Sequence, residues 1–317
     1  MESEAADEAA DAVPSEAADA VTAAADASAA ANDLVRRRAR QLAADAAAAG
    51  DPAGWFETLY AEAQAGTAVV PWDDRQANPH LTEWAAGAAA RGVAGPGRRA
   101  LVVGCGVCED PVFLAGLGCE VTAFDVSPTA VAEARRRFAG APVTFQVADL
   151  LAPPPEWSGA FDLVAELYTV QALYGQAREA AIGALPGLVA PGGTLLVIAR
   201  ATDETDPVRD PAMMPWPLTR SELEALAGSQ LTVRSVEQFL DGEDPPKLRW
   251  RAEFGRGQAG PCGYPPKPSN SPFLTPPMNA CHSSEVNRRT GPVESLLLRT
   301  PISPSGRLAT STQLPLA

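Results

Sequence analysis

The feature that most constrains the fold of this 317-residue chain is the stretch over residues 100–127, ALVVGCGVCEDPVFLAGLGCEVTAFDVS. A short apolar run, Leu101–Val103, leads into a turn with two glycines, Gly104 and Gly106, and then into a short helical segment. A second apolar run follows and carries an acid, Asp125, at its end. This order is typical of the unit that holds a nucleotide-like ligand in a doubly wound sheet.

Further apolar runs continue the alternation of strand and helix, which predicts mostly parallel strands. The last two runs are close enough in sequence to pair as an antiparallel hairpin. The expected strands are Leu101–Val103, Glu120–Val126, Val143–Val147, Phe161–Glu166, Thr194–Ala199, Leu231–Phe239 and Leu248–Phe254. The sequence therefore predicts an α/β fold: a doubly wound, Rossmann-like, seven-stranded and mostly parallel sheet with an antiparallel last strand, flanked by helices.

Capping residues mark the starts of several helices. Asp110 and Ser127 each precede a proline, the pattern of an N-cap followed by the first helical residue, and Thr219 with Glu222 forms a capping box. The expected helices are Asp33–Ala49, Gly54–Gly66, one opening near Asn78, Pro111–Leu117, Pro128–Phe138, Gly175–Val189 and Thr219–Ala227.

The composition divides the chain into a domain over residues 51–255 and two outer segments. Residues 1–50 begin with an Ala/Asp/Glu-rich stretch that lacks large apolar residues, which predicts disorder or a solvated helix. Residues 256–317 hold eleven of the 30 prolines and show no periodicity, which predicts a disordered tail. A frameshift near Arg256 would also produce such a Pro/Ser/Arg-rich tail.

The charge distribution limits the partners. Nine acids precede the first basic residue, Arg36, so the formal charge of −14 leaves −5 for the rest of the chain. Without a basic stripe we expect no nucleic-acid partner, and without a run of about 18 apolar residues we expect no membrane span. The acidic start lacks the positive charge of a signal peptide, which predicts a cytoplasmic protein.

Two acids stand at the ends of predicted strands. Asp125 lies 19 residues beyond Gly106, where a carboxylate accepts hydrogen bonds from both hydroxyls of a ribose. Asp149 follows the third strand and is placed to meet an adenine amino group. Because ligands bind at the carboxyl edge of such a sheet, the glycines and the two acids predict a site there. A solvated loop acid is the alternative for Asp149 and, less readily, for Asp125.

Several motifs together resemble the class I S-adenosylmethionine-dependent methyltransferases: LVVGCG, VTAFDVSPTAV, FQVADL, FDLVAELYTVQALY and VAPGGTLLVIAR. With PWDD, NPHL and PWPLTRSELE, the chain is similar to the thiopurine S-methyltransferase-like branch over about residues 55–254. The resemblance implies S-adenosylmethionine as cofactor and a small-molecule acceptor, with a thiol as one candidate. The cofactor-binding residues expected from it and from the strand ends are Trp72, Gly104, Cys105, Gly106, Asp110, Asp125, Val126, Ala148, Asp149 and Glu166.

The chain departs from the family pattern at two positions. Cys108 stands where the third glycine of the turn is usual, and Val102 stands where an acid is often found; Asp110 is a candidate to replace that acid. A side chain at Cys108 lies where backbone normally approaches the cofactor. A protein that binds the cofactor without turnover is therefore an alternative.

Three further alternatives start from the same stretch. Cys105 and Cys108 form a C-x-x-C between strand and helix, the position of a thioredoxin-like redox pair, but that fold does not explain Asp125 or Asp149. A zinc site would need more ligands than Cys119 adds. A nicotinamide-dependent oxidoreductase needs a third glycine where this chain has Glu109, whose charge opposes a pyrophosphate.

Methyl transfer from a sulfonium is an in-line displacement, in which the protein mainly aligns the reactants. A thiol acceptor needs no base, whereas an amine or hydroxyl does, and Asp73, Glu166 and Tyr168 are the candidate bases. Arg200, after the fifth strand, is a candidate contact for an anionic acceptor or a solvated strand-end charge. Four residues are candidates for an aromatic acceptor pocket or for plain packing: Trp72, Tyr168, Gln171 and Trp216.

Overall fold

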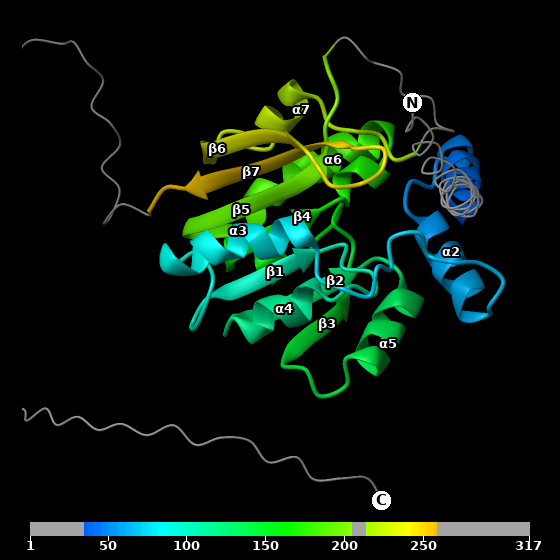
Figure 1. Cartoon of the computed structure of the whole chain (residues 1–317), viewed down its shortest axis with the longest axis horizontal. Helices are drawn as coiled ribbons and strands as arrows, with labels where there is room; N and C mark the ends of the chain where they lie inside the picture. The colour runs from blue at the N-terminus through cyan, green and yellow to red at the C-terminus, as the bar shows by residue number, and fades with distance from the viewer. Residues whose placement is uncertain (1–34, 205–213, 259–317) are drawn as a thin grey trace, which may run out of the picture. The chain divides into compact units, whose positions relative to one another are not determined.

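The computed structural model describes residues 35–204 and 214–258, which belong to one compact unit, Met1–Cys262. They contain a seven-stranded sheet in the order β3-β2-β1-β4-β5-β7-β6 (Figure 1). The first five strands in this order, β3, β2, β1, β4 and β5, are parallel to one another. Strand β7 is antiparallel to both β5 and β6, which confirms the predicted fold class. Their bounds are β1 Arg99–Val103, β2 Glu120–Asp125, β3 Val143–Val147, β4 Phe161–Leu167, β5 Val189–Arg200, β6 Leu231–Leu240 and β7 Leu248–Arg256.

The central strands are apolar on both faces because both faces are covered. In β1, Leu101 and Val103 pack with Val164 of β4 in one hydrophobic cluster, while Val102 packs with Ala165 in another. Buried parallel strands accordingly show continuous apolar runs rather than alternation.

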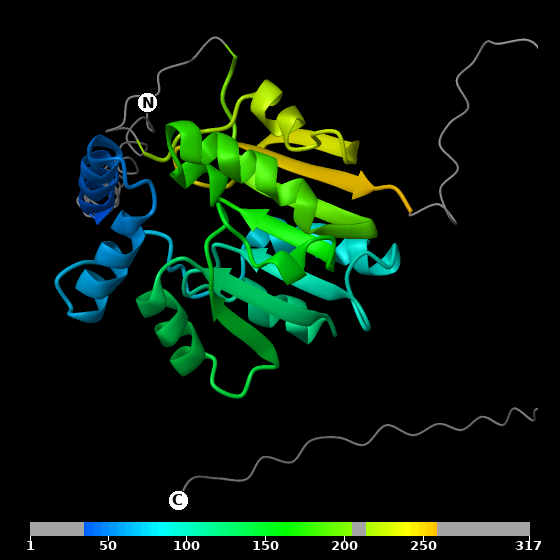
Figure 2. The same cartoon turned by 180° about the vertical axis from the view of Figure 1, so that it is seen from behind.

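Helices cover the two faces of the sheet (Figures 1 and 2). Those whose apolar residues pack with the Val102 side are α3 (Pro79–Ala90), α4 (Asp110–Gly116) and α5 (Pro128–Arg137). Those whose residues pack with the Leu101 side are α6 (Gly175–Leu188) and α7 (Arg220–Ala225). Two short 3₁₀ helices, η1 (Pro155–Trp157) and η2 (Val170–Ala172), lie on either side of β4 in the sequence.

The predicted caps are confirmed at α5 and α7 and are wrong at α4. Ser127 accepts a hydrogen bond from the N–H of Ala130, and Thr219 forms the capping box with Glu222. At α4 the helix already includes Asp110, and its N-cap, Glu109, makes no side-chain cap. The carboxylate of Asp110 faces another partner, described below.

Residues 35–49 form a helix that packs on the domain, which differs from the solvated helix predicted for residues 1–50. Ala39, Leu42 and Ala43 are buried, and they share a hydrophobic cluster with Trp55 and Leu59 of α2 (Gly54–Gln64). This face is made mainly of alanine, whose small side chains fit against the large rings. The predictions for residues 1–33 and for the tail beyond residue 258 lie outside the described residues.

None of the helices in the described ranges combines the length and the apolar character needed to cross a membrane.

Candidate functional site

The candidate site lies at the carboxyl ends of β1, β2, β3 and β4. Gly104 and Gly106 form the turn after β1 with φ of +57° and +50°, the left-handed region that favours glycine. A Cβ on Gly104 would lie 2.4 Å from Thr169 Oγ1, and one on Gly106 would lie 2.4 Å from Tyr60 Oη. Both glycines are therefore required by the backbone and by the close approach of these two side chains.

Asp125 joins the turn after β1 to the turn after β2. Its Oδ2 accepts a hydrogen bond from the N–H of Gly106, and its Oδ1 accepts one from the N–H of Ser127, both at 2.9 Å. The side chain is buried, and this burial raises the pKa of Asp125. Each carboxylate oxygen has a further lone pair, so both can accept from a ligand hydroxyl as well.

Three more of the predicted residues lie beside Asp125. The N–H of Ala148 donates to the carbonyl of Asp125 at 3.1 Å, which brings Asp149 to the same edge. Asp149 is half-buried, and its Oδ1 accepts from the N–H of Leu151 at 2.8 Å. Val126, also half-buried, follows Asp125 directly.

Glu57 of α2, which the sequence reasoning missed, fastens α2 to this edge. Its carboxylate accepts from Ser127 Oγ and Thr129 Oγ1, both at 2.6 Å, and from the N–H of Thr129 at 3.1 Å. Because Ser127 also caps α5, Glu57 holds α2 beside the turn that carries Asp125.

Tyr60 and Trp72 cover the glycine turn. Trp72 Nε1 donates to Tyr60 Oη at 2.9 Å, and the Trp72 ring meets the Trp55 ring edge-on with centroids 6.0 Å apart. A Cβ on Gly106 would lie 3.7 Å from Trp72 Nε1. Trp72 therefore both packs against other aromatic residues and lies at the predicted site.

Asp73 is held in ion pairs on the same loop. Its carboxylate lies 2.6 Å from Arg137 Nη1 and 3.1 Å from Arg75 Nε. Arg137 also pairs with Glu109 and donates to the carbonyl of Val107 at 2.8 Å. Arg137 thus partly neutralises Glu109, so the charge of Glu109 distinguishes between cofactors less sharply than the sequence suggests.

Cys105 and Cys108 are not poised as a redox pair. Burial raises the pKa of both thiols well above the ordinary value; the carboxylates of Asp125 and Asp110 add to this effect at Cys105, and that of Asp110 adds to it at Cys108. A reactive thiol has a lowered pKa instead, so the C-x-x-C here does not support a thioredoxin-like function. The carboxylate of Asp110 accepts from the N–H of Asn78 at 2.6 Å, and burial raises its pKa to about 6.

Glu166, near the end of β4, holds the loop that follows that strand. Its Oε1 accepts from the N–H groups of Thr169 at 2.8 Å and Val170 at 2.9 Å. Thr169 in turn donates through Oγ1 to the carbonyl of Val103 at 3.0 Å. Glu166 is fully buried, its Oε2 has no hydrogen-bond partner within the described ranges, and burial raises its pKa to about 7.

We expect this buried carboxyl to make stability depend on pH. Because the folded pKa is raised, Glu166 keeps its proton where the unfolded chain releases it, so its contribution to stability falls as the pH rises from about 4.5 to about 7. Glu166→Gln removes this titration and keeps an oxygen for Thr169 and Val170. The variant should gain about 2–3 kcal/mol of unfolding free energy relative to the native protein between pH 5 and pH 8.

Urea unfolding at the two pH values checks this. The raised pKa of Asp110 acts in both proteins and cancels in the difference. A difference that is the same at pH 5 and pH 8 would mean that Glu166 titrates alike in the folded and unfolded states.

Tyr168 has a strained backbone at the end of β4. Its φ is +65°, which is uncommon for a residue with a Cβ and marks functional sites more often than other regions. Its ring lies 5.1 Å from the Arg249 guanidinium carbon, and burial raises the pKa of its hydroxyl. Because Glu166 and Tyr168 lie on either side of the last residue of β4, both are at the same edge of the sheet.

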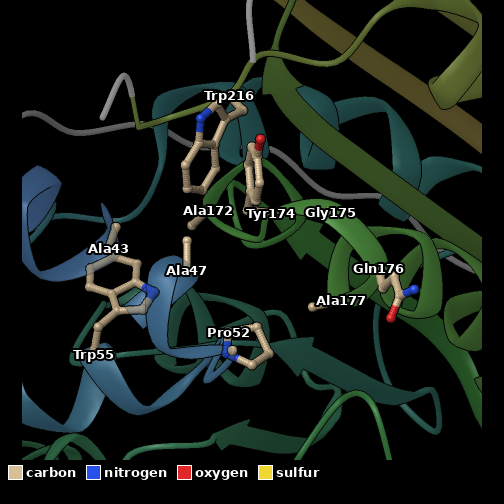
Figure 3. Close-up of a pocket in the computed structure, with 11 residues that line it drawn as sticks. Ala43, Ala47, Pro52, Trp55, Ala172, Tyr174, Gly175, Gln176, Ala177 and Trp216 are labelled. Carbon is tan, nitrogen blue, oxygen red and sulfur yellow. The ribbon is translucent and has the colours of Figure 1, made fainter. Parts of the chain in front are cut away.

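A cavity of about 290 Å³ lies between helix 35–49, the start of α2 and the start of α6 (Figure 3). Three aromatic residues contribute to its wall: Trp55, Tyr174 and Trp216. The Tyr174 and Trp216 rings have centroids 5.1 Å apart. Gln171 lies beside this cavity, since its carbonyl accepts from the N–H of Trp216 at 2.8 Å. Of the predicted acceptor residues, only Trp216 lines the cavity.

The residues at the strand ends suit S-adenosylmethionine. Asp125 would offer its buried carboxylate to a ribose, and Asp149 stands just beyond the end of the adjoining strand β3. Asp125 and Asp110 also supply negative charge beside the glycine turn, which favours a sulfonium and an ammonium group over a pyrophosphate. When bound, this cofactor supplies an electrophilic methyl group.

Residues 100–193 match the family model described as a methyltransferase domain. A search of curated proteins found no match. Among solved structures, the chain is similar to the protein in "Conversion of a Disulfide Bond into a Thioacetal Group during Echinomycin Biosynthesis", with 24% identity, coverage of 63% of this chain and 93% of that chain, and a TM-score of 0.51. It is also similar to the N-methyltransferase NodS from Bradyrhizobium japonicum WM9, in complex with S-adenosyl-L-homocysteine, with 20% identity, coverage of 63% and 98%, and a TM-score of 0.49.

The sheet order and the matched region define a class I methyltransferase fold. Residues 100–193 are a methyltransferase domain, and its cofactor is S-adenosylmethionine. This decides against the nicotinamide-dependent oxidoreductase that the glycine turn alone had left open.

Proposed function

We propose that this enzyme transfers the methyl group of S-adenosylmethionine to the sulfur of a small-molecule thiol, as in the thiopurine S-methyltransferase-like branch that it resembles. The observation that carries the cofactor part of this proposal is the Asp125 carboxylate, buried between the N–H groups of Gly106 and Ser127. In this position it would accept hydrogen bonds from the ribose hydroxyls. The motifs PWDD, NPHL and PWPLTRSELE support the branch.

The other residues at this edge would hold the remaining parts of the cofactor. Gly104, Cys105 and Gly106 would line the methionine part beneath Trp72, and Ala148 and Asp149 would meet the adenine. Val126 would lie beside the ribose. Asp110, fixed on the N–H of Asn78, would contribute charge rather than a direct contact.

The positions of the three candidate bases favour a thiol acceptor. Asp73 is paired with Arg137, and Glu166 accepts from the backbone of Thr169 and Val170. Burial raises the pKa of Tyr168, which makes its hydroxyl a weaker acid. A thiol ionises near neutral pH and becomes a nucleophile without a base, so these residues would align the acceptor rather than take its proton.

A binding and turnover experiment tests this proposal. Calorimetry should show binding of S-adenosylmethionine and S-adenosylhomocysteine but not of NADH. Incubation with methyl-labelled S-adenosylmethionine should label thiophenol, a thiol, but not phenol or aniline. Binding without labelling of any of the three would instead favour the cofactor-binding protein without turnover, and labelling of phenol or aniline alone would exclude the thiol.

A further inference from the structure

Arg200 ends β5 at the edge that carries the candidate site. Its N–H donates to Gln171 Oε1 at 2.7 Å, and its carbonyl accepts from the N–H of Leu218 at 2.8 Å. Its backbone is therefore fixed. The guanidinium makes no hydrogen bond and no ion pair with any residue in the described ranges, although the residue is half-buried.

Among the described residues, more positive than negative charges surround Arg200. Burial lowers its pKa most, and Arg249, Arg36 and Arg40 lower it further, while Glu243 acts in the opposite sense. Glu243 is already paired with Arg249. A half-buried charge without a partner costs stability, and such a charge beside a ligand site is a candidate for ligand binding.

Arg249 of β7, unlike Arg200, is paired with carboxylates among the described residues. Arg249 is the residue opposite Arg200 in the sheet, and both Asp241, at 2.6 Å, and Glu243 pair with it. Arg249 also lies over the ring of Tyr168, at the end of the strand next to β5. Within the described ranges, two carboxylates therefore pair with Arg249 and none pairs with Arg200.

We propose that Arg200 is a specificity residue that binds a carboxylate on the methyl acceptor. A guanidinium presents parallel N–H groups that match a carboxylate in two hydrogen bonds. Gln171 links this position to the aromatic cavity, because its side chain holds the N–H of Arg200 and its carbonyl holds the N–H of Trp216. The acceptor class is then a small, carboxylate-bearing aromatic thiol, an inference that rests on the proposed function.

Matched acceptors test the inference: 2-mercaptobenzoate and its uncharged amide, 2-mercaptobenzamide. The native enzyme should methylate the acid with a kcat/KM at least about tenfold higher than the amide, mainly through KM, because a charged hydrogen-bonded pair is lost with the amide. Arg200→Gln should bring the ratio close to one. Equal rates in the native enzyme, or an unchanged preference in Arg200→Gln, would overturn the inference.

Two controls separate a binding role from a structural one. Arg99→Gln changes an exposed arginine at the opposite edge of the sheet, paired with Asp162 at 3.6 Å, and should keep the preference for the acid. Arg200→Gln should keep or raise Tm, because the guanidinium has no partner in the part of the chain that the structure describes, whereas loss of a structural arginine would lower Tm. A lowered Tm together with an unchanged preference would assign Arg200 to the fold.

Binding to the enzyme loaded with S-adenosylhomocysteine separates this inference from the proposed function. Benzoate should bind at least about tenfold more tightly than benzamide, and Arg200→Gln should abolish the difference. If neither thiol is methylated but benzoate binds in this way, the thiol proposal fails and the carboxylate site stands. If both thiols are methylated equally and benzoate does not bind preferentially, the carboxylate site fails and the thiol proposal stands.

Discussion

Asp125→Ala is expected to weaken S-adenosylmethionine binding by about 3–4 kcal/mol, which is roughly two to three orders of magnitude in Kd. Each ribose hydroxyl would donate to a charged oxygen, and such a bond contributes about 1.5–3 kcal/mol. The substitution also removes the acceptor of the N–H groups of Gly106 and Ser127, so the turn that would hold the methionine part loses its attachment. Calorimetric titration measures the change.

A carboxylate at the other edge of the sheet provides the matched control. Asp162 Oδ2 accepts from the N–H of Arg99 at 2.9 Å, far from the carboxyl ends of the strands, so Asp162→Ala should leave the affinity unchanged. Asp125→Asn keeps the size of the side chain and tests whether its charge is needed. An affinity for Asp125→Ala within about threefold of the native value, in a variant with native Tm, would reject the ribose role.

The strands could be predicted because the burial of a strand determines the polarity of consecutive residues. Leu101–Val103 is apolar throughout since a central parallel strand is covered on both faces. The start of β5 was harder to predict from the sequence. The sequence Pro191-Gly192-Gly193 is typical of a turn and predicts a strand from Thr194, whereas β5 begins at Val189, which pairs with Phe161 ahead of an irregularity in β4.

Packing was harder to predict where the buried residues are small. Helix 35–49 buries Ala39 and Ala43, and alanine occurs equally in exposed helices, so its sequence does not distinguish a packed face from a solvated one. The alanine face is buried because the rings of Trp55 and Trp216 pack in the same cluster, and Trp216 is distant from this helix in the sequence.

Some residues of the candidate site could likewise be predicted from the sequence, and others could not. The acids Asp125 and Asp149 could be placed because the end of a strand fixes a residue at the edge of the sheet. Glu57 could not, since its partner Ser127 is 70 residues away and its hydrogen bonds depend on how α2 sits on the fold. The burial of Arg178 could not be predicted either, because its partner Glu222 is 44 residues away and an arginine on a helix is ordinarily exposed.

Arg178→Met is expected to lower the free energy of unfolding by about 3–5 kcal/mol, because it breaks a buried pair by removing one partner. The guanidinium is buried and donates to both oxygens of Glu222, at 2.8 and 3.0 Å. It also donates to the carbonyls of Val170, Trp216 and Pro217, at 2.9–3.2 Å. Urea unfolding measures the loss.

The same hydrogen bonds connect stability with acceptor binding. Val170 begins η2, and Trp216 lines the aromatic cavity, so Arg178 joins the loop after β4 to the wall of that cavity. We therefore expect Arg178→Met to raise the KM for the thiol while the Kd for S-adenosylmethionine stays close to native. Arg136→Met is the control, since Arg136 pairs with Glu133 on the exposed face of α5 and its substitution should change neither stability nor KM appreciably. Equal losses in the two variants would show that Arg178 has no more than a surface role.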